Sequence, residues 1–110
     1  MAETDIVYLY VTCPTLTEAE TLAEAIVAER LAACANILPG MRSVYWWQGK
    51  LEKADEVVLI FKTQADLVDA ATTAIKARHS YTVPCVLPLP VLPGGNPDYR
   101  AWLAEQTTKT

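Results

Sequence analysis

The chain alternates short apolar runs with segments whose apolar residues recur at helical spacing. Residues 6–11 form a continuous run of β-favouring residues, which predicts a buried strand. A helix is expected next, capped either by Thr15 with Glu18 or by Thr17 with Glu20. Its apolar face is defined by three residues at helical spacing: Ala19, Leu22 and Ile26.

The middle of the chain predicts a long β-hairpin. Residues 31–47 favour a strand, which the Pro-Gly pair at 39–40 should interrupt by a kink or bulge. The Gln-Gly pair at 48–49 suits the turn, because glycine takes positive φ without strain. Residues 50–62 then form the return strand. Its inner half is apolar on both faces, so we expect both faces to be covered.

The rest of the chain predicts a helix, a strand and a final helix. Thr63 and Asp66 are expected to open the first of these helices, which should end near His79. Residues 85–89 suit an exposed or irregular edge strand, because nearby prolines lack ladder donors. Asn96 should cap the last helix. The expected apolar stripes are Leu67, Ala71, Ala74 and Ile75 on the first helix and Tyr99, Trp102 and Leu103 on the second.

This order of elements is the split βαβ arrangement with one helix added. We therefore predict an α+β fold, a ferredoxin-like βαββαβ sandwich with a long central hairpin and an extra C-terminal helix, in one domain spanning residues 1–110. Right-handed crossovers place both main helices on one face of the sheet. A second apolar set would then lie bare on the other face and mark an interface between subunits. That set comprises Tyr8, Tyr10, Val58 and Ile60.

Composition and charge limit the classes of partner and the compartment that we expect for this chain. The chain has 110 residues, of which 52% are hydrophobic and 20% charged, which fits one ordered globular domain. A net charge of −4 with scattered basic residues argues against nucleic acid. No segment has the length of a membrane span, so we expect no membrane partner. The acidic residues 1–5 lack a signal-peptide layout, and three widely spaced cysteines suit a reducing compartment, which predicts the cytoplasm.

Several motifs, taken together, are similar to those of one family, the CutA divalent-cation tolerance proteins. They cover nearly the whole chain in the right order: LAACAN at 31–36 with Pro-Gly at 39–40, YWWQGK at 45–50, EVVLIFKT at 56–63, HSYTVP at 79–84, and DY with WL within 98–103.

The resemblance implies a cytoplasmic homotrimer, with its sheets packed around the three-fold axis and a role in tolerance of copper or another divalent cation. It implies neither an enzymatic reaction nor an organic cofactor. The architecture also resembles the PII signalling proteins, which bind small ligands at subunit clefts. A sensor of a small anion is therefore an alternative function, and a non-catalytic scaffold is another.

Four residues are candidate metal ligands. His79 is the only histidine, and imidazole suits copper and zinc, although a helix C-terminus also explains it. Cys13, Cys34 and Cys85 are soft donors without a Cys-x-x-Cys pair, so packing roles are the alternative. Cys13 lies beside a helix N-terminus, which favours a thiolate. Relatives commonly carry glutamate where this chain has Thr82 and Cys85, a change expected to favour softer ions.

Three residues are candidates for a ligand cleft. Lys62, at the end of an apolar strand, could hold an anionic group, and a solvated strand end is the alternative. Tyr81 belongs to the His segment. Trp47 lies near the hairpin tip, where packing across a subunit interface is favoured over gripping a ligand. Because the chain lacks a phosphate loop, a nucleophile elbow and a triad pattern, we expect no catalytic residues.

Overall fold

The computed structural model describes residues 5–108. Residues 1–4, which carry most of the acidic segment behind the cytoplasmic expectation, lie outside this range, as do residues 109–110. The elements are, in chain order, β1 (Ile6–Cys13), α1 (Leu16–Ala28), β2 (Cys34–Trp47), β3 (Lys50–Gln64), the 3₁₀ turn η1 (Ala65–Leu67), α2 (Val68–Arg78), β4 (Val86–Pro90) and α3 (Pro97–Gln106).

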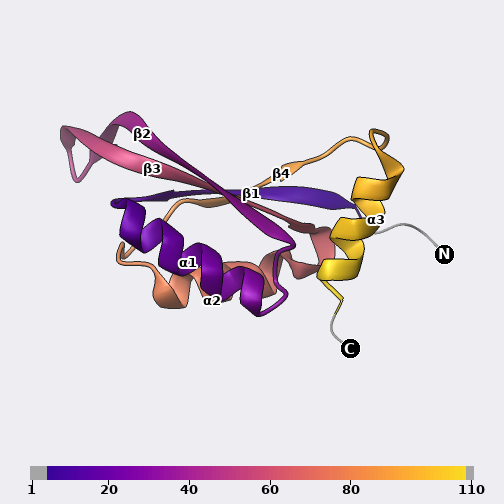
Figure 1. Cartoon of the computed structure of the whole chain (residues 1–110). Helices are drawn as coiled ribbons and strands as arrows, with labels where there is room; N and C mark the ends of the chain where they lie inside the picture. Colours follow the sequence, from indigo (N-terminus) through magenta and orange to yellow (C-terminus); the bar gives the residue numbers. More distant parts are fainter. Residues whose placement is uncertain (1–4, 109–110) are drawn as a thin grey trace.

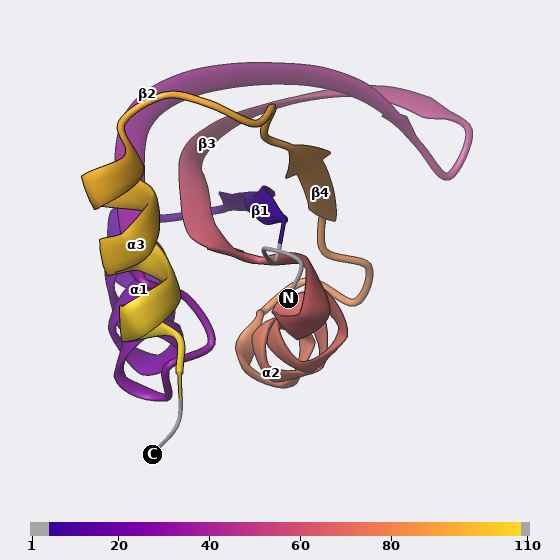
Figure 2. The same cartoon turned by 90° about the vertical axis from the view of Figure 1, so that its right-hand side faces the viewer.

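The four strands form one sheet in the order β2-β3-β1-β4, and each neighbouring pair is antiparallel. Helices α1 and α2 lie together on one face of this sheet, while α3 stands at one end (Figure 1). The hairpin of β2 and β3 extends beyond the other strands and arches above the face that has no helix (Figure 2). The α+β, ferredoxin-like architecture predicted from the sequence is therefore confirmed.

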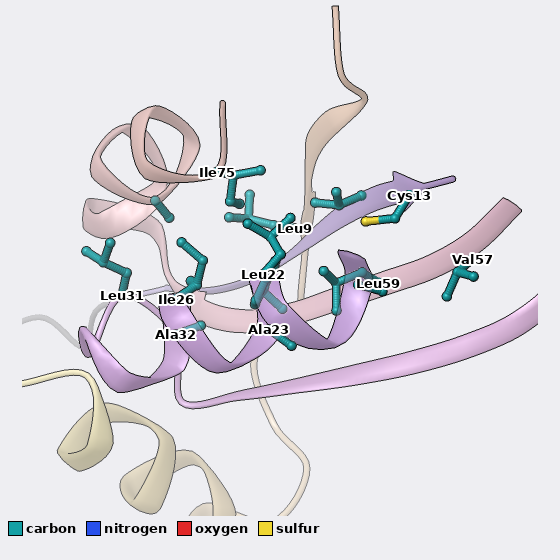
Figure 3. Packing of buried hydrophobic residues seen from close by; sticks show 14 residues of the cluster. Leu9, Cys13, Leu22, Ala23, Ile26, Leu31, Ala32, Val57, Leu59 and Ile75 are labelled. Atoms are coloured by element: carbon teal, nitrogen blue, oxygen red, sulfur yellow. The ribbon is translucent and has the colours of Figure 1, made fainter. Parts of the chain in front are cut away.

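The core lies between the two helices and the sheet (Figure 3). Alternate residues of β1 and β3 point into it, as the two-residue period of a strand requires. Helix α1 supplies Ala19, Leu22 and Ile26, the predicted apolar face, and Thr15 caps it by accepting a hydrogen bond from the backbone N–H of Glu18. The largest fully buried residues are Leu9, Val11, Leu22, Ile26, Leu59, Phe61, Ile75 and Leu103.

The hairpin follows the predicted pattern. The pairing of β2 with β3 shifts by one residue between Leu38 and Met41, which places the irregularity at the Pro-Gly pair. At the turn, both Gln48 (φ 49°) and Gly49 (φ 79°) have positive φ, the conformation of a tight two-residue hairpin. Strand β2 begins at Cys34 rather than at residue 31, because Arg30 (φ 63°) first reverses the chain after α1.

The predicted start of the second helix is wrong. Thr63 lies inside β3, with its side chain fully buried, and its hydroxyl donates to the carbonyl of Leu31 at 2.7 Å. Asp66 falls in η1, and α2 begins only at Val68, with no side-chain cap. Threonine is favoured both at helix N-caps and in strands. Here the strand pairing and the buried hydrogen bond hold Thr63 in the strand. The helix ends at Arg78, so His79 is its C-cap as expected.

The last two elements need two corrections. Strand β4 lies at the edge, as its prolines predict, but runs one residue later than expected. Asn96 caps α3 by accepting a hydrogen bond from the N–H of Asp98 at 2.9 Å. Of the expected stripe only Leu103 is buried, in a small cluster with Ile6 and Ala33. Tyr99 and Trp102 stay 42% and 40% exposed in the single chain, and they pack against each other.

The open face of the sheet is apolar, as predicted, but the predicted set is not bare, because Val58 is buried and Tyr8, Tyr10 and Ile60 are half-buried within the single chain. Strand pairing places Tyr10 opposite both Ile60 of β3 and Leu87 of β4. Leu87 and Leu38 are 60% and 53% exposed there. The single chain thus leaves an apolar surface uncovered along its sheet. Among the helices of residues 5–108, none has both the length and the apolar character needed to cross a membrane.

The buried hydroxyl of Thr63 provides a test of the fold. Thr63→Val keeps the side-chain volume but removes the hydrogen bond to Leu31, so we expect the free energy of unfolding to fall by about 1–3 kcal/mol. Urea denaturation measures it. Thr63→Ser is the matched control, because it keeps the hydroxyl and loses one methyl group. A valine variant as stable as the parent would contradict this role of the hydroxyl.

Candidate functional site

His79 occupies a defined place between three elements. Its ring is buried at the C-terminus of α2, and Nε2 lies 2.8 Å from the carbonyl oxygen of Thr12 near the end of β1. Nδ1 accepts a hydrogen bond from the backbone N–H of Tyr81 at 3.0 Å. Since a carbonyl only accepts and an N–H only donates, these partners assign a neutral imidazole with its proton on Nε2.

Cys13 and Glu18 complete a cluster with His79. One ligand atom from each residue lies within 4.8 Å of the other two. A Glu18 carboxylate oxygen is 3.4 Å from His79 Nδ1 and also accepts the backbone N–H of Ser80 at 3.0 Å. The strand end of β1, the first turn of α1 and the C-terminus of α2 bring the three side chains together. We call this group the Cys-Glu-His cluster.

Cys13 is a protonated thiol in this environment. Burial, with smaller contributions from the carboxylates of Glu18 and Glu56, raises the pKa of the Cys13 thiol to about 11. The expectation that the start of α1 favours a thiolate is therefore wrong, because desolvation and two nearby negative charges outweigh the helix dipole. Cys13 can act as a ligand only if the metal displaces its proton.

The other two cysteines lie outside this cluster. Cys85 is part-buried beside β1, where its thiol is 3.8 Å from the carbonyl oxygen of Tyr10. Burial, and secondarily the charge of Glu56, raises its pKa. Cys34 lies at the start of β2, 3.8 Å from the hydroxyl of Tyr99 on α3. The four predicted metal ligands are thus divided, and only Cys13 and His79 belong to the cluster.

A cavity of about 690 Å³ opens beneath the arching hairpin. We call it the hairpin cavity. Strand β1, the outer half of β2, Glu56 of β3 and the segment after His79 all contribute to its lining. Its lining residues are Tyr10, Thr12, Met41, Ser43, Val44, Tyr45, Trp47, Glu56, Ser80, Tyr81, Thr82, Val83 and Cys85.

Glu56 is the one charged residue of this lining. The residue is only 8% exposed, and one carboxylate oxygen accepts the hydroxyl of Tyr81 at 3.0 Å. Burial, then the hydrogen bond to Glu56 and its charge, raises the pKa of the Tyr81 hydroxyl well above its usual range. The hydroxyl is therefore a stable hydrogen-bond donor to the carboxylate at neutral pH.

The predicted ligand-cleft residues lie in two places. Tyr81 and Trp47 both line the hairpin cavity, whereas Lys62 does not. The Lys62 ammonium donates to the hydroxyl of Tyr99 at 3.4 Å and lies over the rings of Tyr8 and Tyr99 at 5.6 and 5.5 Å. The hairpin cavity consequently offers a negative group and no basic side chain, the opposite of an anion site.

A family model described as CutA1 divalent ion tolerance protein matches residues 7–106. The chain belongs to this family. The resemblance found in the sequence motifs is thus confirmed over nearly the whole length.

Curated relatives agree with that assignment. The rice Protein CutA 1, chloroplastic (Oryza sativa subsp. japonica) is 46% identical over 104 residues, which are 94% of this chain and 58% of the rice protein. The divalent-cation tolerance protein CutA of Thermus thermophilus is 43% identical over 97 residues, which are 88% of this chain and 93% of that protein. The chain spans only 58%, 55% and 55% of the rice, Arabidopsis and mouse CutA proteins, which are longer.

Solved CutA structures share the fold. The crystal structure of CutA1 from Oryza sativa has a TM-score of 0.92 at 45% identity, over 97% of each chain. The Archaeoglobus fulgidus protein, described as a periplasmic divalent cation tolerance protein, has a TM-score of 0.89 at 37% identity, covering 94% of this chain and 99% of that one. These values show that the CutA fold is retained along the whole described chain.

Sequence reasoning missed two residues of these sites. The sequence predicts Glu18 only as the partner of Thr15 in a helix cap, because its approach to His79 depends on how α1 and α2 pack. Glu56 was read only as part of a family motif. One signal was available for Glu56, since the two-residue period of a strand places it on the same face as Val58 and Ile60, in a strand whose two faces are both expected to be covered.

Alkylation tests the state of Cys13. With a pKa of about 11 and a fully buried side chain, Cys13 should react with iodoacetamide more slowly than Cys34, and its rate should still rise with pH above 9. Peptide mass spectrometry after timed labelling measures each site. Rapid labelling of Cys13 at pH 7 would contradict the protonated, buried thiol.

Proposed function

We propose that this protein acts in divalent-cation tolerance by binding soft or borderline cations weakly at the Cys-Glu-His cluster. The single observation that carries the proposal is the approach of three different metal-ligating side chains to within 4.8 Å, two of them buried. Membership of the divalent ion tolerance family supports a role that involves such ions. Binding and release of an ion need no covalent chemistry, so the proposed role is non-catalytic.

The hydrogen bonds of His79 suit a ligand role. A metal-binding histidine usually donates its second ring N–H to a carbonyl or carboxylate, which fixes the tautomer. Nε2 already has such a partner in the carbonyl of Thr12, at 2.8 Å. Nδ1 faces the Glu18 carboxylate at 3.4 Å and is the nitrogen that would take the ion.

Three costs keep the affinity low. Nδ1 must give up the hydrogen bond from the N–H of Tyr81, and Glu18 must share the oxygen that accepts the N–H of Ser80. The Cys13 thiol, with its pKa of about 11, must lose a proton. A sulfur, a nitrogen and an oxygen donor together favour zinc or copper over magnesium or calcium.

Cys85 supports a second candidate position for a soft ion. It stands at the position where the motif resemblance implies a glutamate, and it lines the hairpin cavity together with Met41. Two sulfur donors suit Cu(I) more than a divalent ion. The Met41 sulfur already accepts the hydroxyl of Tyr10 at 3.4 Å, however, so the Cys-Glu-His cluster is the stronger candidate.

Metal titration distinguishes the two positions. We expect zinc and Cu(I) to bind under reducing conditions, with binding weakened at least about tenfold by Cys13→Ser or His79→Gln, because each variant removes one ligand. Cys34→Ser is the matched control, because it removes a thiol outside the cluster. Isothermal titration calorimetry measures the affinities. If Cys85→Ser lost metal binding while Cys13→Ser kept it, the result would contradict the Cys-Glu-His cluster and favour a site in the hairpin cavity.

The pH dependence of zinc binding has a definite sign. Because the ion displaces the Cys13 proton, apparent affinity should rise by about tenfold per pH unit at pH values well below the pKa of about 11. Titrations at pH 6.5, 7.5 and 8.5, in buffers corrected for their own zinc binding, measure the slope. If the zinc affinity of both the parent protein and Cys13→Ser were independent of pH, binding would release no thiol proton and the prediction would be wrong.

We further propose that the functional unit is a homotrimer. The support is the uncovered apolar face of the sheet, where Leu38, Leu87 and Leu89 are each about half exposed. Single chains of this size do not normally leave such a surface in water. Light scattering of the purified protein should therefore give three times the chain mass, and a monomer at micromolar concentration would contradict the assembly.

The other functions remain weaker proposals. A PII-like sensor of a small anion is supported by Lys62 alone, which lies apart from the hairpin cavity. A scaffold role is supported only by the proposed trimer, and no particular residue points to it. The proposal places the protein in the cytoplasm, because widely spaced free cysteines suit a reducing compartment, and cell fractionation tests this against the periplasmic description of the archaeal relative.

A further inference from the structure

The segment that follows α2 is held by side chains rather than by its own backbone. Residues 80–84 belong to no helix or strand, and within the described chain they form no backbone–backbone hydrogen bond. We call residues 80–84 the strap. The N–H of Ser80 donates to a Glu18 carboxylate oxygen at 3.0 Å. The N–H of Tyr81 donates to His79 Nδ1, also at 3.0 Å, so two members of the Cys-Glu-His cluster fix the start of the strap.

One of these contacts competes with metal binding for a single lone pair. A neutral imidazole has one protonated nitrogen and one nitrogen with a free lone pair. His79 Nε2 carries the proton, since it faces the carbonyl oxygen of Thr12 at 2.8 Å, so Nδ1 holds the lone pair. Either the N–H of Tyr81 or a metal ion can occupy that lone pair, but not both. A Glu18 oxygen, by contrast, has more than one acceptor position and can bind an ion while it keeps the N–H of Ser80.

The side chain of Tyr81 links this amide to the opposite side of the strap. Its ring packs beside that of His79, with centroids 4.9 Å apart, and its hydroxyl donates to Glu56 at 3.0 Å. Residues 80–83 all line the hairpin cavity. Because no backbone ladder holds the strap, losing the amide contact leaves Tyr81 fixed only by its ring and hydroxyl. A shift of Tyr81 therefore acts on the hydrogen bond to Glu56 and on the wall of the cavity.

We infer that the strap is a switch operated by the cation, an inference that rests on the proposed cation role of the Cys-Glu-His cluster. Without an ion the strap is closed, with the N–H of Tyr81 on His79 Nδ1. An ion that takes Nδ1 displaces this N–H to water, opens the strap and loosens the contact between Tyr81 and Glu56. By linkage, every contact that keeps the strap closed lowers the affinity for the ion.

The hydrogen bond between the Tyr81 amide and His79 can be observed directly. NMR detects a scalar coupling between two nitrogen atoms across an N–H···N hydrogen bond. In the full-length protein labelled with 15N, this coupling should be present without metal and lost in saturating zinc. The amide proton of Tyr81 should then exchange with water at least about threefold faster. The N–H of Ser80 should change less, because Glu18 can be shared.

Two substitutions at His79 test the switch without an ion. His79→Gln can direct its amide N–H to the carbonyl of Thr12 but has no acceptor at the Nδ1 position. The amide of Tyr81 should therefore exchange as fast in this variant as in the zinc-bound parent. His79→Asn is the matched control, because its side-chain oxygen lies near the Nδ1 position and can accept the N–H, so exchange should stay slow. Thermal melts confirm that both variants are folded.

The hydroxyl of Tyr81 provides a reciprocal test. Tyr81→Phe keeps the ring and removes the hydrogen bond to Glu56, which favours the closed strap, so zinc should bind about two- to tenfold more tightly. Tyr99→Phe is the matched control, because it removes a hydroxyl that contacts Lys62 instead, and it should leave zinc affinity unchanged. Calorimetry under reducing conditions measures both affinities.

The outcomes separate the switch from the metal role itself. If zinc binding depends on Cys13 while the coupling between Tyr81 and His79 persists, the cluster is a cation site and the switch is wrong. If zinc binding depends on neither Cys13 nor His79, the site and the switch are both wrong. Absence of the coupling in the metal-free protein would also overturn the switch. So would an unchanged zinc affinity in Tyr81→Phe, because ion binding would then leave the contact with Glu56 intact.

Discussion

The helices of this chain cover one face of a sheet that is apolar on both faces. The two crossovers of the βαββαβ topology have the same hand, so α1 and α2 must lie together and cannot protect the other side. The inner face becomes the core. The outer face, with Tyr10, Ile60 and Leu87 in register, has to be covered by something else. The long hairpin, the proposed trimer and the hairpin cavity all follow from that imbalance.

The segment after α2 connects the two proposed sites. His79 reaches the end of β1 through Nε2, and Ser80 and Tyr81 donate their backbone N–H groups to Glu18 and to His79. The ring of Tyr81 packs beside the ring of His79, with centroids 4.9 Å apart, and its hydroxyl meets Glu56 in the hairpin cavity. One short loop therefore joins the Cys-Glu-His cluster to the cavity, because the Tyr81 side chain contacts both.

The sequence predicted the elements more fully than the sites. Strand and helix periodicity, the Pro-Gly bulge and the caps at Thr15 and Asn96 depend on near neighbours, and these predictions are confirmed. The predicted cap at Thr63 is wrong because a contact with a residue far away in the chain, the carbonyl of Leu31, places this threonine in the strand.

The sites depend on contacts between residues far apart in the chain. Glu18 and His79 are 61 positions apart in the chain, and Glu56 and Tyr81 are 25 apart. No local sequence motif therefore predicts either contact. Residue type was still informative, because His79 and Cys13 were both identified as candidate ligands and the structure brings them together. Residue type alone could not show that Cys34 and Lys62 lie outside these sites. In the fold, both side chains lie beside Tyr99 of α3.

The most direct test of the metal role is the nitrogen NMR spectrum of the single imidazole during zinc titration. Without metal, His79 should show the neutral tautomer with its proton on Nε2, as the carbonyl of Thr12 requires. Zinc should shift the Nδ1 resonance and leave the Nε2 proton in place, and Cys13→Ser should weaken that response. An Nδ1 resonance that stays unchanged in excess zinc would contradict the Cys-Glu-His cluster as the cation site.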